Sequence, residues 1–247
     1  MAELTATGPV LVHFFDPAQL NSVRALPYIA EWNRRYSDLG LTTLAIHSPR
    51  FAFTADAAVA MDAIERLDVE HAVGLDPDYV IWHDYGCKGW PSLFLWGRGG
   101  ALRWAHNGEG EYQATEEAIQ EELRSSDIAA ELPAPMEPMR PTDMPGVLLP
   151  VPTAEIFPGG SAAEPWTPEP GGSPIVIDYA AGEAWLVADG EGEVSVTVDG
   201  EGRDAFRVPP AGLSKLAGDG PHESHRVELG VPDGVRVWAI SFAPGSP

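Results

Sequence analysis

The chain has 247 residues, of which 44% are hydrophobic and 21% are charged, as in ordinary globular proteins with one large or two modest domains. Acidic residues outnumber basic residues in both halves, and the formal net charge is −22, so we expect neither nucleic acid nor anionic membrane surfaces as partners. No stretch predicts a membrane-spanning helix, and the first residues lack the basic and apolar regions of a secretory signal. We therefore expect a cytoplasmic location.

The chain contains a single cysteine, Cys87. An intramolecular disulfide needs two thiols, and structural zinc sites usually need several, so both are excluded within this chain. His222, Glu223 and His225 could ligate a metal only on a helix face, whereas their surroundings predict strand or loop, so we expect a solvated surface cluster. We predict no metal and no cofactor.

The first half alternates strand and helix patterns, which predicts an α/β sandwich with one mixed sheet. Pro27 lies inside the first predicted helix and should kink it, and Asp78 is placed to cap a short helix. The predicted strands are 10–15, 41–46, 72–75, 92–96 and 101–105. The predicted helices are 22–36, 55–67, 78–85 and 114–123.

Seven of the 22 residues between 131 and 152 are proline, which predicts a semi-rigid linker laid over the surface. Beyond it the pattern is all β, with Asp-Gly turns, and predicts a β-sandwich or jelly roll. The expected organisation is therefore an α/β domain (1–130), a linker (131–152) and a β-sandwich domain (153–247). The predicted strands of the last domain are 175–177, 184–187, 194–198, 205–208, 226–229 and 235–242.

Several short motifs carry a family resemblance. Those in the first half are Phe14-Phe15, Leu26-Pro27-Tyr28, Ile46 to Phe53, Asp76 to Trp82, Gly89 to Leu93 and Gly108 to Tyr112; those in the second half are Thr153 to Phe157, Val196 to Gly200 and Trp238 to Phe242. With these motifs the first half resembles the TlpA-like branch of the thioredoxin superfamily. The whole chain resembles the soluble C-terminal part of DipZ-type membrane thiol reductases, in which a β domain similar to carbohydrate-binding modules follows the TlpA-like domain.

The resemblance places the CxxC pair of such relatives at Gln19-Leu20-Asn21-Ser22, where neither end is a cysteine. A helix N-terminus there lowers the pKa of a thiol and stabilises the attacking thiolate. Gln19 offers no comparable nucleophile, and the Ser22 hydroxyl is better explained as a helix-capping or first-turn group. The glutamate that such relatives carry after the His-Ser/Thr-Pro turn is replaced by Arg50, which suggests that the proton-transfer group was lost with the thiols.

Trp90-Pro91 aligns with the cis proline of thioredoxin folds, which flanks bound peptide in that family. We therefore expect a candidate binding groove without redox chemistry, and a protein or peptide partner. The residues of this candidate groove are Gln19, Leu20, Asn21, Ser22, Arg50, Trp90 and Pro91.

The favoured interpretation is a redox-inactive thioredoxin-like protein that binds or scaffolds rather than catalyses. One alternative is a thiol-dependent oxidoreductase that uses Cys87 alone, although we expect this cysteine to be partly buried. The other alternative is carbohydrate binding by the β domain, for which Trp166, in a Pro/Gly-rich loop, is the best candidate for exposure. Glu109 and Glu111, in a glycine-flanked turn, are expected to be solvated and structural rather than catalytic.

Overall fold

A computed structural model of the chain describes residues 2–125, 131–209 and 212–246, and its contacts divide it into two compact units. The first unit comprises the described residues of Met1–Asp16, Asn21–Pro49 and Ile64–Pro145. The second comprises Pro17–Leu20, Arg50–Ala63 and the described residues of Gly146–Pro247. Within the described residues, no helix is both long and apolar enough to cross a membrane.

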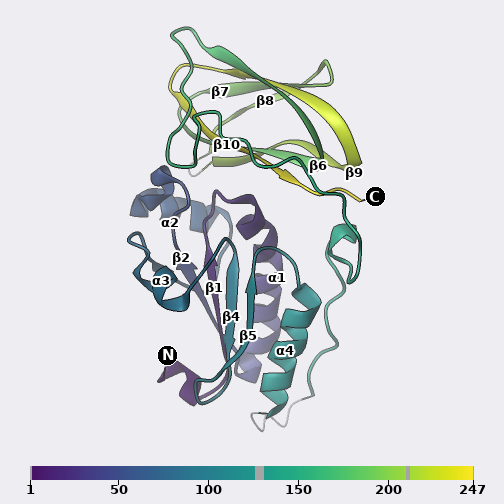
Figure 1. The fold of residues 1–247 in the computed structure, drawn as a ribbon. Helices are drawn as coiled ribbons and strands as arrows, with labels where there is room; N and C mark the ends of the chain where they lie inside the picture. Colours follow the sequence, from purple (N-terminus) through teal and green to yellow (C-terminus); the bar gives the residue numbers. More distant parts are fainter. Residues whose placement is uncertain (1, 126–130, 210–211, 247) are drawn as a thin grey trace. The chain divides into compact units, whose positions relative to one another are not determined.

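The first unit holds a five-stranded sheet in the order β3-β2-β1-β4-β5 (Figure 1). Strands β1, β2 and β3 are parallel, whereas β4 and β5 run antiparallel to their neighbours. Every residue of β1 is buried, as expected for a central strand covered on both faces. The strand bounds are β1 Val10–Phe15, β2 Thr42–His47, β3 Ala72–Leu75, β4 Ser92–Trp96 and β5 Leu102–Asn107.

Helices cover both faces of this sheet. Apolar side chains of α1 and α4 pack with Leu11, Leu93 and Leu95, and those on the α3 side pack with the alternate residues Val10 and Phe14 (Figure 1). The helix bounds are α1 Leu20–Tyr36, α2 Ala57–Arg66, α3 Val80–Tyr85 and α4 Tyr112–Ser125, and short 3-10 helices lie at Leu4–Ala6, Ser37–Leu39, Ala52–Ala55 and Pro141–Asp143.

Helix α1 continues through Pro27 from Leu20 to Tyr36. Proline removes one backbone donor from a helix, but Leu26 and Ile29 are buried on either side of it and hold the helix against the core. The proline therefore does not divide the predicted helix.

The second unit contains a five-stranded sheet in the order β10-β6-β9-β7-β8 (Figure 1). All of its strand pairs are antiparallel. The all-β class predicted for this part of the chain is confirmed. The strand bounds are β6 Ser173–Gly190, β7 Glu193–Val198, β8 Glu201–Arg207, β9 Gly212–Val231 and β10 Val235–Ala243.

The prediction of two separate strands at 175–177 and 184–187 is wrong, because both lie in the single long strand β6. The interruption near Gly182 is a register shift against β9 and not a turn. A Cβ atom at Gly182 would lie 2.3 Å from Cα of Gly245, and one at Gly218 would lie 2.0 Å from the carbonyl oxygen of Gly182. Backbone therefore packs directly against backbone where the register shifts.

The proline-rich segment is predicted as a semi-rigid linker laid over the surface. Its residues 131–145, which we call the strap, pack on α1 and α4 of the first unit. Leu132 and Met136 join the apolar cluster of these helices. The Met136 N–H donates to Glu116 Oε2 over 2.8 Å, and Gln120 Nε2 donates to the Pro133 carbonyl over 2.9 Å. The predicted domain boundary at residue 130 lies outside the described residues, and the boundary at 152 stays a prediction.

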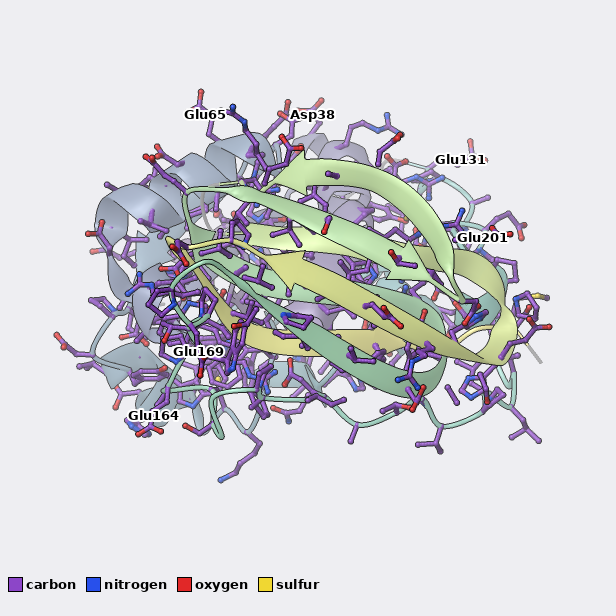
Figure 2. All side chains as sticks on the ribbon, turned by 90° about the horizontal axis from the view of Figure 1, so that it is seen from above. Asp38, Glu65, Glu131, Glu164, Glu169 and Glu201 are labelled. Carbon is purple, nitrogen blue, oxygen red and sulfur yellow. The ribbon has the colours of Figure 1, made fainter. Side chains whose placement is uncertain are left out.

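The negative charge lies largely on the surface of the molecule. Figure 2 shows carboxylates pointing outward from the ribbon, and the six labelled ones all belong to exposed residues. Such a surface keeps like charges apart in water and favours solubility. The labelled residues are Asp38, Glu65, Glu131, Glu164, Glu169 and Glu201.

A histidine pair interrupts the apolar interior of the first sheet. His13, fully buried in the centre of β1, has its Nε2 atom 2.7 Å from Nε2 of His71. One ring must donate and the other accept, so at least one imidazole is neutral. Burial, and then the charge of His71, lower the pKa of His13 well below its usual value, and burial lowers the pKa of His71 to about 4.

This pair predicts a loss of stability in acid. In the unfolded chain His71 titrates near 6.5, whereas in the folded chain its pKa is about 4. The unfolded state binds more protons between these values, so the free energy of unfolding should fall as the pH drops from about 6.5 to about 4. After allowance for the partial exposure of His71, we expect a loss on the order of 2 kcal/mol. Denaturant unfolding of the wild type and His71→Gln across this range measures it, and parallel pH profiles would contradict the prediction.

Candidate functional site

The position of the missing thiols lies at the start of α1, and three of its four residues are buried. Gln19 is 5% exposed, Leu20 is 2% exposed and Ser22 is 1% exposed, whereas Asn21 is half-buried. Ser22 Oγ accepts a hydrogen bond from the Asp16 N–H over 3.3 Å, so the hydroxyl helps to fix the turn between β1 and the helix. A first-turn structural role for Ser22 therefore agrees with the geometry.

Trp90 and Pro91, the other principal members of the candidate groove, lie just before β4. Their peptide bond is cis, as the family resemblance implied. Trp90 Nε1 donates to the Ser48 carbonyl over 2.8 Å, and its ring packs against Trp82 with centroids 4.3 Å apart. Pro91 is buried and Trp90 is half-buried, so one side of the Trp90 ring is engaged within the first unit.

Asp76 connects this loop to α3. Its carboxylate accepts hydrogen bonds from the Ile81 and Trp82 N–H groups over 3.0 and 2.8 Å, and from Ser48 Oγ over 3.2 Å. Asp76 therefore satisfies the free donors at the start of α3, and the predicted cap Asp78 is an exposed residue. The assignment to Asp78 is wrong because Tyr79 adopts a left-handed conformation (φ 60°), which brings the earlier carboxylate to the helix end.

His47, at the end of β2, is buried beside this network. Burial lowers its pKa, although the charges of Asp16 and Asp76 oppose the shift. Its Nε2 atom has no hydrogen-bond partner among the described residues. A neutral imidazole packed edge-on to Phe15 fits the predicted packing role at a strand end.

Cys87 is buried on the α3 side of the sheet with Val12, Phe14 and Phe94. Burial raises the pKa of its thiol to about 11. Its backbone N–H donates to the Trp82 carbonyl at the C-terminal end of α3, the end of a helix that disfavours a thiolate. The thiol is therefore protonated at neutral pH and only 7% exposed.

Arg50, where the resemblance implied a glutamate, is held within the second unit. Its guanidinium forms an ion pair with Glu155 and lies 5.5 Å from the ring centroid of Phe51 and 5.8 Å from that of Phe157. Ser241 Oγ donates to the same Glu155 carboxylate over 2.7 Å. Arg50 therefore serves as an ion-pair anchor in this unit, a role that the sequence alone did not indicate.

Glu109 is the principal correction in the first unit, because this carboxylate was expected to be solvated. Its side chain is 16% exposed and accepts from Arg24 Nε over 2.7 Å and from Arg140 Nη2 over 3.0 Å. Burial raises its pKa, and the two arginines act against that shift. Glu111, by contrast, is exposed, with a positive φ of 50°. The pairing of Glu109 with Arg140 was not predicted, because an arginine in a proline-rich segment belongs to no periodic pattern or motif.

Two further side-chain predictions concern the second unit. Trp166 is half-buried against the β core, where its backbone bridges to Val237, so the expectation of an exposed platform is wrong. The described residues contain no group of three or more His, Cys, Asp or Glu side chains placed to hold a metal. His225 Nδ1 instead lies 2.7 Å from Asp199 Oδ2.

The strand order, the helices on both sheet faces and the cis proline before β4 define the first half as a thioredoxin-like α/β domain, followed by an all-β domain. The redox position at the start of α1 lacks both thiols. No protein-family model matches the chain.

The chain is similar along nearly its whole length to the protein DipZ. It is 24% identical to DipZ of Mycobacterium tuberculosis and of Mycobacterium bovis over 94% of its residues, and it spans 38% of the length of those relatives. NHL repeat-containing protein 2 of Gallus gallus is 30% identical over 43% of the chain and 16% of that protein. The likeness of the β domain to carbohydrate-binding modules stays a prediction.

Solved structures similar to the chain cover about half of it. A thiol-disulfide isomerase from Corynebacterium glutamicum matches 50% of this chain and 85% of that chain, with 18% identity and a TM-score of 0.45. A secreted disulfide oxidoreductase of Mycobacterium tuberculosis matches 47% and 84%, with 14% identity and a TM-score of 0.41.

The Asp76 network predicts a difference between two neighbouring carboxylates. Asp76→Ala removes the acceptor for two helix N–H groups and the Ser48 hydroxyl, and should lower the free energy of unfolding by about 2 kcal/mol. Asp78→Ala, at an exposed position, should change it by less than about 0.5 kcal/mol. Urea unfolding of both variants measures the difference, and equal losses would contradict the assignment of the cap.

Proposed function

We propose that this chain is a redox-inactive thioredoxin-like protein that binds or scaffolds a protein or peptide partner. The observation that carries the proposal is that Gln19 and Ser22 occupy the ends of the redox motif while the one cysteine of the chain is buried elsewhere. Disulfide exchange needs an attacking thiolate and a second thiol to resolve the mixed disulfide. A chain with one protonated thiol has neither.

Single-cysteine oxidoreductase chemistry is poorly supported. A reactive cysteine needs a lowered pKa and access to substrate, whereas burial raises the pKa of Cys87 to about 11 and leaves 7% of the residue exposed. At neutral pH the thiolate is a small fraction of the population, on the order of one part in ten thousand. The thiol is better explained as a small apolar core group.

A binding role is supported by the cis peptide bond between Trp90 and Pro91 and by the contacts that fix the neighbouring residues. Trp90 is fixed by Ser48 and Trp82, and Asp76 fixes the neighbouring helix. The groove predicted from the sequence (Gln19, Leu20, Asn21, Ser22, Arg50, Trp90 and Pro91) stays a prediction.

The proposal predicts an inert thiol and no reductase activity. Wild type and Cys87→Ser should give the same background rate in dithiothreitol-coupled insulin reduction. Iodoacetamide should label native Cys87 at least about a hundredfold more slowly than the same thiol in denatured chain, because the native thiol is protonated and buried. Mass spectrometry follows the labelling. Activity that disappears in Cys87→Ser would overturn the redox-inactive assignment.

Carbohydrate binding by the β domain is a second candidate, favoured by one shallow hollow within the second unit. Thr153, Asp178, Tyr179 and His225 are among its lining residues, and Asp199 holds His225 through Nδ1. Fixed side-chain donors and acceptors are the groups that recognise sugar hydroxyls, and Asp178 and His225 supply them here, whereas Tyr179 is buried in the core.

This candidate predicts localised spectral changes on sugar addition. Maltose, cellobiose and chitobiose can be titrated into labelled protein, with binding expected to shift the amide NMR signals of residues 178–180 and 224–226. His225→Ala should weaken any such binding about tenfold, whereas Glu164→Gln, at an exposed residue outside the hollow, should leave it unchanged. No shift with all three sugars at millimolar concentration would reject the candidate.

A further inference from the structure

Arg140, which belongs to the strap, donates a hydrogen bond from every nitrogen of its guanidinium group. Arg140 Nη2 donates to Glu109 over 3.0 Å and to the Tyr112 hydroxyl over 3.2 Å, Nε donates to Asp143 over 2.8 Å, and Nη1 donates to the Arg24 carbonyl over 3.2 Å. All three guanidinium nitrogens therefore have a partner. This geometry suits the planar fork of arginine and would be poorly matched by a lysine ammonium.

Aromatic side chains complete the surroundings of the guanidinium. Tyr28 and Tyr112 stack in parallel with centroids 3.7 Å apart, and the Arg140 guanidinium carbon lies 5.9 Å from each ring centroid. A guanidinium within about 6 Å of an aromatic ring gains a cation–π attraction. Burial and the Asp143 hydrogen bond raise the pKa of Tyr28 to about 12, so this ring stays neutral at neutral pH.

Most of the acceptors do not belong to the strap. Glu109 lies before α4, Tyr112 begins α4, and the Arg24 carbonyl and Tyr28 belong to α1. Arg24, itself 7% exposed, pairs with Glu109 independently of Arg140. The site is therefore built by the α/β core, and the strap supplies Arg140 and Asp143.

The site also opens toward solvent, because the Arg140 side chain is 25% exposed. Next to Arg140, the Met139 N–H donates to the Tyr28 hydroxyl and that hydroxyl donates to Asp143, each over 2.7 Å, so these two bonds would break if residue 140 left the site. The remaining strap contacts lie several residues away: the Ala134 carbonyl accepts from Arg35, and the Met136 N–H donates to Glu116. A local displacement around residue 140 can leave those contacts in place. The strap thus resembles an internal ligand that is exchangeable at one end.

We propose that Glu109, Tyr112, Tyr28 and the Arg24 carbonyl form a guanidinium-binding site, which Arg140 fills within the chain and an arginine side chain of a partner polypeptide fills in its place. The inference rests on the binding role proposed above and gives it a ligand chemistry. Glu109 stays paired with Arg24 whether or not the site is filled. The carboxylate is therefore not left as an unpaired buried charge when one guanidinium leaves and another enters.

Chemical rescue tests the site directly. Arg140→Ala should lower the thermal midpoint of the full chain, and millimolar methylguanidinium should restore part of that loss by binding the vacated site. Methylammonium, which has the charge without the fork, should restore much less. Adding Glu109→Gln to Arg140→Ala should weaken methylguanidinium binding at least about tenfold.

Arg34→Ala is the matched control, because Arg34 is 71% exposed and pairs with Glu31 on α1. Methylguanidinium should shift the thermal midpoint of Arg34→Ala no more than it shifts that of the wild type. Equal responses of the Arg34→Ala and Arg140→Ala variants, or equal rescue by methylammonium, would overturn the site. The insulin-reduction assay does not depend on the guanidinium site. A failed rescue would therefore reject the site without bearing on the redox-inactive assignment.

The wild type supplies a second measurement that does not depend on how well Arg140→Ala folds. The Arg140 Nε–H gives an NMR signal that reports its hydrogen bond to Asp143. Excess acetyl-Met-Arg-Pro-amide, which copies residues 139–141, should diminish that signal by competition, and the peptide with lysine in place of arginine should not. An unchanged signal with the arginine peptide would overturn exchange with a partner.

Discussion

The carboxylate of Glu109 is the electrostatic centre on which the first unit depends. It lies between Arg24 of α1 and Arg140 of the strap, so one side chain links a helix, the loop before α4 and a proline-rich segment. A buried carboxylate without partners carries a large desolvation cost, which two guanidinium groups offset. Because each partner comes from a different part of the chain, the ion cluster stabilises the tertiary arrangement more than any single element.

The regular part of the fold could be predicted because periodicity reports burial. The apolar run at 10–15 and the alternation of strand and helix patterns were sufficient for the α/β half, and Trp90-Pro91 located the cis bond. The prediction of two strands within β6 failed at Gly182, because a glycine is expected both at a turn and at a register shift between paired strands. Local pattern cannot distinguish these cases, because the difference lies in the partner strand.

Polar contacts over long sequence separations were the least predictable part of the candidate site. The pairing of Arg140 with Glu109, of Arg50 with Glu155 and of His13 with His71 joins residues that share no local motif. Each depends on how elements fold together and not on spacing along the chain. Asp76 took the role expected of Asp78 for a related reason, because one left-handed residue redirects the chain before α3.

Several hydrogen bonds of the first unit have a structural role although the redox position carries no thiol. Ser22 now satisfies a backbone donor at Asp16, and Ser48 serves both Asp76 and Trp90. These bonds stabilise the loops independently of any electron transfer. The hydrogen bonds therefore have a thermodynamic role of their own in this unit.

The glycine contacts of the second unit impose a constraint of another kind. Gly182, Gly218 and Gly245 lie far apart in sequence, yet at each of them a Cβ atom would come within 2.8 Å of another segment's backbone. A mutation at one position cannot be compensated by a smaller residue at another, because all three already lack a side chain. A methyl group at any of these glycines would therefore force the backbones of β6, β9 and the segment around Gly245 apart.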